Sequence, residues 1–424
     1  MAASPSTARA INDRLALRLL QQEGPLTAGQ LKTLTGLSRP TVADLVERLQ
    51  DSGLVRVVGE TGDRRRGPNA RLYGIVADRA HLAALDVRTH SVSVVVADLL
   101  GETLTEAVLP IGSDTATEAA VERAVALLER TAGQAGSVPL HSVGIGAPGL
   151  VDPVTGELRD SSGLPAWHRR LVAVLQERLP ATVLVENETN LAALAEQRLG
   201  AARGQDTFVL LWLGHGVGAA VVLDGKLRRG ASGGAGEIAF LPVPGTSRLP
   251  SAVACDGGFH TLAGSTGIAE LAARYGIAAV PAPQEPPSAA LVRTAVRAVG
   301  GAPAKEARSA AAFLDDLADR LALGAAAEEA RSAAAFLDDL ADRLALGAAA
   351  VSAVLDPGRI VLAGEAGHAG GEALAARVED RLAAMSPLRT EVRAGALGGA
   401  AVLRGALLTA RDAAQDELFA PQVL

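Results

Sequence analysis

The sequence is poor in the features that mark secreted and membrane-spanning proteins. It has one cysteine, Cys255, in 424 residues, which excludes a disulfide framework within the chain and fits a reducing compartment. No uninterrupted apolar run reaches about 18 residues, the length that a membrane-spanning helix needs. The first fifteen residues also lack the apolar core of a secretion signal. We therefore expect a soluble, cytoplasmic protein with no membrane partner, long enough for two or three domains.

Charge is unevenly distributed along the chain. The formal net charge is −7, which taken alone argues against a nucleic-acid partner. Residues 1–80, however, contain twelve basic and eight acidic residues, so the remaining residues carry a net charge of −11. A basic N-terminal segment on an acidic body predicts that contact with nucleic acid is confined to one face.

Residues 26–71 have the pattern of a winged helix-turn-helix. A short helix is followed by a turn at Gly36 and by a second helix that Ser38 can cap, with Pro40 tolerated in its first turn. Gly53 ends that helix, and residues 55–58 and 71–75 alternate sufficiently to form a hairpin. We expect the core of this domain to be formed by Leu15, Leu17, Leu19, Leu20, Leu31, Leu34, Val42, Leu45, Val46 and Leu49.

This domain predicts two kinds of DNA contact. The exposed start of the second helix would enter a major groove, while the hairpin tip would hold the flanking phosphates. The alternative is a small helical domain whose arginine run is only a solvated loop. The DNA-binding residues that we expect are Ser38, Arg39 and Thr41 on the helix, and Arg64, Arg65 and Arg66 at the tip.

After residue 80 the pattern changes to apolar strands that alternate with longer helical stretches, such as 117–132 and 190–199. This order predicts an α/β fold with buried sheets covered by helices. The expected strands lie within residues 81–88, 91–99, 142–149, 182–189, 207–214 and 359–365.

Glycines and acidic residues near several strand ends indicate a ligand cleft. Gly214, Gly216 and Gly218 would let a backbone approach an anion or a sugar, and Gly364 suggests a second such turn. The alternative is tight hairpin turns, which we prefer for Gly225. Asn187, Glu188 and Glu237 lie where polar groups can converge on a hydroxyl-rich ligand, although Glu237 could instead stabilise a cap or loop.

Four segments, taken in order, resemble the ROK family of repressors and sugar kinases: residues 144–158, 185–196, 213–240 and 355–365. The resemblance covers nearly the whole chain. It implies an actin/hexokinase-like, two-lobed α/β body behind the winged helix-turn-helix. We expect the DNA-binding domain in residues 1–78, the first lobe in 79–190 rejoined by 395–424, and the second lobe in 191–394.

The chain departs from the family pattern at the positions that serve phosphoryl transfer. The family's kinases carry an Asp-Ile-Gly-Gly-Thr loop after the first strand, whereas residues 86–90 here read Asp-Val-Arg-Thr-His. Glu188 stands where the family has its catalytic Asp, and one extra methylene displaces a base by about 1 Å, which can cost on the order of a hundredfold in rate. Both departures argue against an enzyme.

The family's zinc site is also incomplete. Phe240 replaces its histidine, and only Cys255 remains of its three cysteines, so the closed four-ligand site of structural zinc cannot form. We expect no metal and no cofactor. The missing histidine is also a sugar ligand in the family, and His260 could replace it. His215, in a glycine-rich loop, could contact an anionic effector or cap the turn.

One string of 22 residues occurs twice, at 306–327 and 329–350. Each copy is an amphipathic helix, and in the first Phe313, Leu314, Leu317 and Leu321 form the apolar stripe. An offset of 23 residues rotates the second stripe by roughly 140°, so a single helix could not bury both against one core. We expect the chain to break near Gly324, the second copy to take the core position, and the first to loop out or pack on a neighbour.

Together these features predict a sequence-specific transcriptional regulator, acting as a repressor of carbohydrate-related genes. Its expected partners are double-stranded operator DNA, a sugar or sugar phosphate effector, and its own copies in a homodimer or homotetramer. One alternative is an ATP-dependent sugar kinase with an accessory DNA-binding domain. Another is a ligand-independent DNA-binding protein whose sensor has degenerated.

Overall fold

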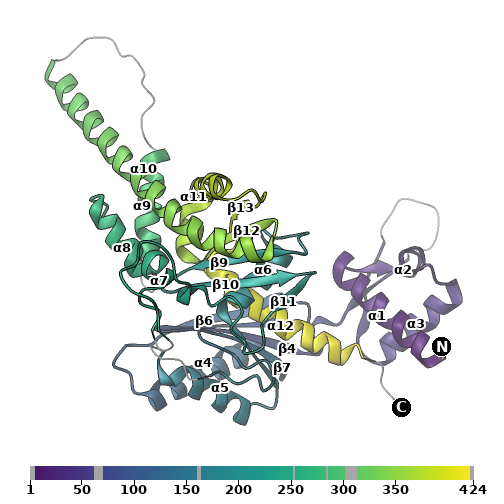
Figure 1. Cartoon of the computed structure of the whole chain (residues 1–424). Coiled ribbons are helices and arrows are strands. Elements are labelled where there is room, and N and C mark those ends of the chain that lie inside the picture. The colour runs from purple at the N-terminus through teal and green to yellow at the C-terminus, as the bar shows by residue number, and fades with distance from the viewer. Residues whose placement is uncertain are drawn as a thin grey trace.

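The chain folds into a small winged helix-turn-helix and a larger two-lobed α/β body (Figure 1). In this computed structural model three sheets organise the chain, one in the small domain and one in each lobe. The residues described are 5–61, 70–159, 164–251, 254–282, 285–300 and 313–420.

The small domain follows from its caps and its apolar spacing. Thr27 and Gln30 form a capping box at the second helix, Gly36 ends it with φ 71°, and Ser38 caps the third. Every expected core position of the third helix is buried, whereas Leu15 is 39% and Leu34 50% exposed, so the assignment of these two residues to the core was wrong. The elements are α1 (Pro5–Glu23), β1 (Leu26–Thr27), α2 (Ala28–Thr35), α3 (Arg39–Asp51), β2 (Val55–Glu60) and β3 (Arg71–Ile75), in the sheet order β1-β3-β2.

The first lobe is a five-stranded sheet in the order β6-β5-β4-β7-β8. Its central strands are buried on both faces, as expected of apolar strands between helices. Helices α4 and α5 cover one face, and α6 and α12 pack against the other. The elements are β4 (His81–Arg88), β5 (Ser91–Asp98), β6 (Thr103–Pro110), α4 (Thr117–Ala135), β7 (Leu140–Ala147), α5 (Ala166–Arg178), β8 (Thr182–Asn187) and α6 (Glu188–Leu199).

The second lobe is a five-stranded sheet in the order β11-β10-β9-β12-β13. One face carries the largest apolar cluster, to which α7 to α11 contribute. The other face meets α6 and α12, which therefore form a layer between the two sheets. The elements are β9 (Phe208–Leu213), β10 (Val217–Leu223), β11 (Lys226–Arg228), α7 (Phe259–Ala263), α8 (Ser265–Arg274), α9 (Pro287–Gly300), α10 (Phe313–Leu355), β12 (Arg359–Ala363), α11 (Gly364–Met385), β13 (Glu391–Ala394) and α12 (Ala401–Leu418).

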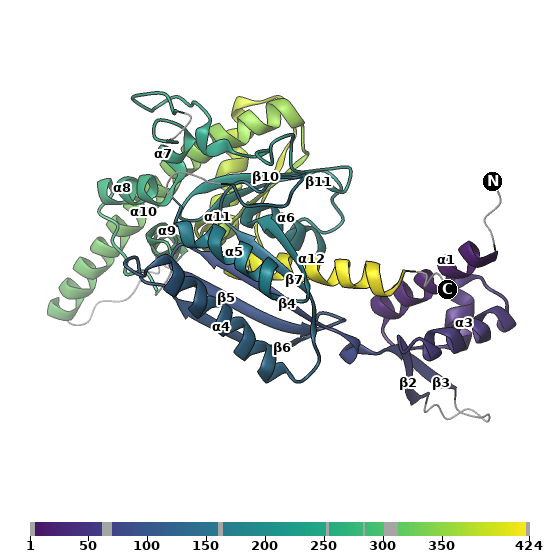
Figure 2. The ribbon, with the colours of Figure 1, turned by 90° about the horizontal axis from the view of Figure 1, so that it is seen from below.

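Helix α12 joins the body to the small domain. Ala410 and Ala414 of its last turns, and Phe419 directly after it, belong to the same apolar cluster as Leu17 and Leu45 of the small domain. Figure 2 shows this yellow helix running from between the lobes to the winged helix-turn-helix. Arg14 of α1 also pairs with Asp416. One helix thus touches all three parts of the chain.

Helix α10 corrects the expectation for the duplicated string. It is one continuous helix of 43 residues with no break near Gly324, and its first half projects from the body (Figure 1). A glycine inside a helix costs only about 1 kcal/mol relative to alanine, and the alanines around it favour the helix. The second copy takes the core position as expected, because Phe336, Leu337, Leu340 and Leu344 are fully buried. The side chains of the first copy's stripe lie outside the described residues.

Within the described part of the chain, no helix combines the length and the apolarity that crossing a membrane requires.

Candidate nucleic-acid interface and ligand cleft

The start of α3 presents a polar, exposed surface. The Ser38 Oγ accepts a hydrogen bond from the Thr41 backbone N–H at 3.3 Å and lies 2.7 Å from the Thr41 Oγ1, so these two side chains bind each other as a cap. Arg39, between them in sequence, is exposed and pairs with no acidic group of the described residues. Of the three expected helix contacts, Arg39 is therefore the one whose side chain has no partner among the described residues.

Arg48, a residue that the sequence pattern did not single out, links α3 to α1. Its guanidinium donates to Asp13 of α1 at 2.6 Å and also pairs with Asp44, one turn earlier in α3. Desolvation opposes the charge on Arg48, but the Asp13 hydrogen bond outweighs it and raises the Arg48 pKa. This pairing holds α3 against α1, and the apolar side chains of α3 pack into the core of the small domain.

The hairpin that follows α3 is antiparallel, with Val55 opposite Ile75 and Glu60 opposite Arg71. It closes where the Thr61 N–H donates to the Ala70 carbonyl at 2.9 Å. Strands β2 and β3 lie beside α3 at one end of the molecule, which is the position of a wing (Figure 2). The expected tip contacts, Arg64, Arg65 and Arg66, lie outside the described residues.

A second site lies where β4 ends between the two lobes. The Arg88 guanidinium donates to Asp86 at 2.8 Å and to the Gly399 carbonyl at 3.1 Å, and it pairs with Glu365 at the start of α11. Desolvation disfavours the charge on Arg88, but Asp86 and Glu365 outweigh it and raise the Arg88 pKa. The side chain that replaces the phosphate loop is thus neutralised by the protein itself.

Two glycines near this site, Gly214 and Gly364, serve packing within the protein. A Cβ on Gly214 would lie 2.7 Å from the Trp212 Nε1 and 3.0 Å from a Glu365 oxygen. Gly364 has φ 77°, and a Cβ there would lie 2.6 Å from the Leu213 carbonyl oxygen. Both glycines therefore let β9 and the start of α11 approach each other. Gly225, in contrast, occupies the two-residue turn between β10 and β11, as preferred from the sequence.

Acidic side chains surround Arg88. Burial, reinforced by the nearby charge of Asp86, raises the pKa of Glu188 to about 8. Burial likewise raises the pKa of Asp86, whose Oδ1 is buried without a hydrogen bond among the described residues. The charge of Glu237 also raises the Glu188 pKa, so these two expected ligand residues lie within electrostatic reach of each other. Glu188 is therefore mostly protonated at neutral pH and can donate a hydrogen bond.

Asn187 and His260 occupy different settings. The Asn187 side chain caps α6, accepting from the Thr189 N–H at 2.8 Å and donating to the Gly149 carbonyl at 2.9 Å. His260 lies half-buried in α7, where burial lowers its pKa and the charge of Asp256 opposes that shift. The backbone of His215 accepts a hydrogen bond from the Ser265 N–H at 3.1 Å. The amide of Asn187 is thus already occupied, whereas Glu188 and Glu237 remain the stronger ligand candidates.

Two buried glutamates that the sequence pattern did not reveal hold this region together. Glu186 accepts from the Asn190 amide at 2.9 Å and from Arg229 at 2.6 Å. Glu196, at 0% exposure, accepts from the Leu397 N–H at 2.9 Å and so ties α6 to the segment before α12. A glutamate inside a helical stretch gives no local sign of such a distant partner.

Comparison with known proteins identifies both parts of the chain. Residues 82–413 match the ROK family and residues 11–66 match the MarR family. A xylose repressor from Caldicellulosiruptor bescii is 26% identical over 237 residues, which are 55% of this chain and 59% of that protein. The DNA-binding transcriptional dual regulator NagC from Escherichia coli K12 is 28% identical over 240 residues, 55% of this chain and 57% of its own length. The matched regions therefore span less than two thirds of these relatives.

The fold extends the likeness over nearly the full chain. A solved ROK family transcriptional regulator, a homolog of the E. coli MLC protein, superposes with a TM-score of 0.69 at 21% sequence identity. The superposition covers 97% of this chain and 98% of that one. The winged helix-turn-helix and the actin/hexokinase-like body are therefore the architecture of this chain, as the sequence predicted.

Proposed function

The chain belongs to the ROK family, and we propose that it is a sequence-specific DNA-binding regulator, acting as a repressor of carbohydrate-related genes. One observation carries this proposal: helix α12 of the body packs into the core of a winged helix-turn-helix. In the same body, Arg88 stands where the family's kinases have their phosphate loop, and it is paired with Asp86. We propose that the DNA-binding part comprises residues 1–78, the first lobe residues 79–190 rejoined by 395–424, and the second lobe residues 191–394. The named relatives, a xylose repressor and NagC, support the assignment.

We propose that the operator is a palindrome bound by a dimer or a larger oligomer. In that arrangement the recognition helices would be separated by about 34–36 Å or a multiple of it. Arg39 and Thr41 would read base edges, with Ser38 fixing the helix start, and Arg64 to Arg66 would contact phosphates. The excess of basic over acidic residues in residues 1–80 supports contacts of this segment with DNA phosphates beside the base contacts.

The effector that we propose is a sugar or a sugar derivative bound between the lobes. Glu188, in its neutral form, and Glu237 would form hydrogen bonds with hydroxyl groups of the effector. Asn187, which caps α6, would form part of the wall of the site, and His260 of α7 would provide a further contact. An effector changes DNA binding only if it has different affinities for two states of the protein. Helix α12 can carry that difference, because it leads from Gly399, an Arg88 partner, to the core of the winged helix-turn-helix.

Sugar phosphorylation is the weaker alternative for this body. ATP phosphates need bare backbone and free cationic groups, whereas Arg88 occupies the loop and is already paired with Asp86 and Glu365. The carboxylates of Asp86 and Glu365 would also repel phosphate. We therefore propose that the chain is a sensor and not a kinase. ATP turnover by the purified protein with any member of a panel of sugars would contradict this.

Binding to DNA upstream of the protein's own gene tests the regulatory proposal. Binding is measured at two salt concentrations for the wild type, for Arg39→Ala and for Arg203→Ala, a basic residue of the body. We expect saturable, salt-sensitive binding whose preference for one site falls only in Arg39→Ala. Binding that is equal on specific and unrelated DNA in all three proteins would contradict sequence-specific regulation.

A further inference from the structure

The slot that holds the second copy of the duplicated string recognises it through several specific contacts. Arg343 donates to the carbonyls of Leu262 at 3.1 Å and Gly267 at 3.0 Å. Asp339 accepts from the Tyr275 hydroxyl at 2.6 Å, and Gly347 leaves room for the ring of Phe259, 2.5 Å from where a Cβ would lie. Helices α7, α8, α9 and α11 form the walls of this slot.

Every one of these contacts comes from a residue that the first copy repeats 23 positions earlier. Arg320 corresponds to Arg343, Asp316 to Asp339, and Gly324 to Gly347. The apolar stripe is repeated in the same way, with Leu317 in the place of Leu340. The walls of the slot therefore cannot distinguish the two copies by the contacts that lie within the 22-residue string.

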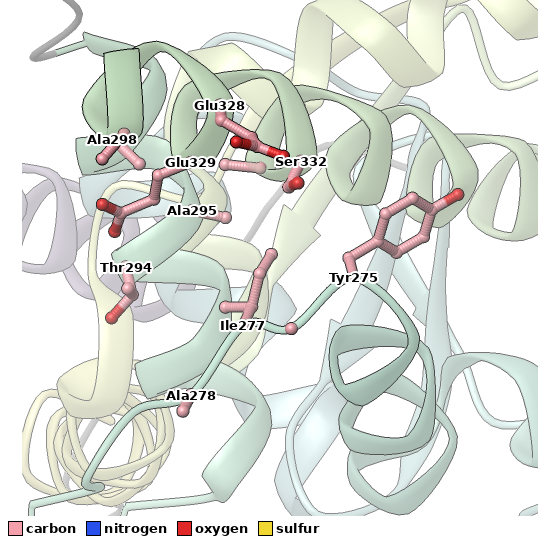
Figure 3. Close-up of a pocket in the computed structure, with 12 residues that line it drawn as sticks. Tyr275, Ile277, Ala278, Thr294, Ala295, Ala298, Glu328, Glu329 and Ser332 are labelled. Carbon is pink, nitrogen blue, oxygen red and sulfur yellow. The ribbon is translucent and has the colours of Figure 1, made fainter. Parts of the chain in front are cut away.

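The residues that follow each copy do distinguish them. Val351 and Ser352 continue the second copy, at 9% and 0% exposure. If the first copy filled the slot, Glu328 and Glu329 would take these two positions. A carboxylate buried without a partner is costly, whereas both glutamates are now exposed on the wall of a cavity of about 440 Å³ (Figure 3).

The connections permit the exchange. Ala298, near the end of α9, lines the same cavity as Glu329, the first residue of the second copy (Figure 3). The five residues 301–305 that lead from α9 to the first copy can span about 16 Å when extended, which suffices for neighbours around one cavity. On the other side, the second copy would become part of the connection to β12, and lengthening such a connection costs little.

We propose that the duplication provides a spare core helix. The slot accepts residues 306–327 when residues 329–350 cannot fill it, and Val351 and Ser352, against Glu328 and Glu329, select the second copy in the wild-type chain. The chain therefore has two folded registers that differ by 23 residues. The body can absorb damage to a helix that would otherwise be indispensable.

Core substitutions in each copy test the proposal. Aspartate is placed at the same stripe position of the first copy (Leu317→Asp), of the second copy (Leu340→Asp) and of both. Leu271→Asp in α8, a fully buried wall residue with no duplicate, is the control. Unfolding in urea is followed by circular dichroism. We expect Leu317→Asp to unfold like the wild type and Leu340→Asp to keep a cooperative transition at a lower midpoint. The double variant and Leu271→Asp should show no cooperative unfolding transition.

Two further measurements identify the register. Trypsin should cut after Arg343 in Leu340→Asp but not in the wild type, because the second copy has left the slot. Adding Glu328→Val and Glu329→Ser to Leu340→Asp should raise its midpoint, since these changes reproduce the residues after the second copy. If Leu340→Asp is as unfolded as the double variant and the added changes do not restore it, the two-register proposal is wrong. Continued protection of Arg343 in a folded Leu340→Asp would overturn it equally.

Discussion

Arg88 and Glu365 meet between the two lobes, one at the end of β4 and the other at the start of α11. They are 277 residues apart, and Asp86 accepts a hydrogen bond from the Nε of the same guanidinium. The charge of Arg88 is thus balanced by two carboxylates of the protein itself. Each lobe thus contributes one partner to a contact that holds the lobes together.

Removing Arg88 should destabilise the body. Arg88→Ala leaves the buried Asp86 and the half-buried Glu365 without their counter-charge, and breaking a largely buried pair in this way costs about 3–5 kcal/mol. Urea unfolding of the whole chain measures the loss. The control is Arg178→Ala, which breaks an exposed pair with Glu122 and should cost no more than about 1 kcal/mol. Equal stability of the two variants would show that the lobes do not depend on this pair.

The stability of the protein should depend on the ionisation of Glu188. Because its pKa is raised in the folded state to about 8, the folded protein binds this proton more tightly than the unfolded chain does. The contribution is complete below about pH 4.5, the ordinary range of the group, and is lost as the pH rises through about 8. The free energy of unfolding should therefore fall over this window, by at most roughly 1.4 kcal/mol per pH unit.

Glu188→Gln tests that dependence, because a neutral amide carries no titrating proton. We expect a flatter pH profile of unfolding between pH 5 and 8 than in the wild type, whereas Glu129→Gln on the exposed side of α4 should keep the wild-type slope. Part of the slope should persist in Glu188→Gln, because burial also raises the pKa of Asp86 and Glu237. A wild-type slope in Glu188→Gln would show that the group is already ionised at low pH.

A methyl group on one glycine of α12 should separate that helix from α6. In Gly405→Ala the new Cβ would lie 2.0 Å from the Leu191 carbonyl oxygen, so the backbones must move apart. Overpacking of this kind typically costs about 1–3 kcal/mol. Gly399→Ala is the matched control, because no atom lies within 4 Å of its Cβ position. Thermal unfolding compares the two, and weaker operator binding in Gly405→Ala alone would support a role for α12 in coupling.

The arginines of the wing should set affinity and not sequence preference. Replacing Arg64, Arg65 and Arg66 by alanine removes up to three phosphate contacts, each of which changes the slope of log K against log salt by about 0.9. We expect the slope to become shallower by up to about 2.7 while the ratio of specific to unspecific binding stays near its wild-type value. Fluorescence anisotropy across a salt series measures both. An unchanged slope would place the wing away from DNA.

Local rules were sufficient for much of the fold. Ser38 caps α3 and Gly53 follows it at φ 70° because both effects depend only on neighbouring residues. Five of the six expected strands were found because they are mostly buried and read as apolar runs, whereas the sixth, β8, is mostly half-buried. Strand β6 was not assigned, since its residues alternate between half-buried and exposed and include the polar Thr103, Thr105 and Glu106.

The interactions that shape the site could not be read from the sequence in the same way. Glu365 and Glu196 acquire their partners only when segments about 200 or more residues away are brought beside them. The break expected near Gly324 was wrong for the opposite reason, because helix propensity kept the chain helical where packing no longer required it. The contacts of Glu365 and Glu196 were hidden because their partners lie far away along the chain. The helix at Gly324 continues because of local helix propensity alone.

The shared helix α12 also bears on how the protein is made. The winged helix-turn-helix is synthesised first, yet its apolar cluster includes Ala410, Ala414 and Phe419, which leave the ribosome only after both lobes have been translated. Its core therefore stays incomplete throughout synthesis of the body. A chain that stalls before residue 410 would carry α3 without the packing that α12 supplies to its domain. Completion of the body is thus a precondition for a finished winged helix-turn-helix, so we expect truncated products to bind the proposed operator poorly.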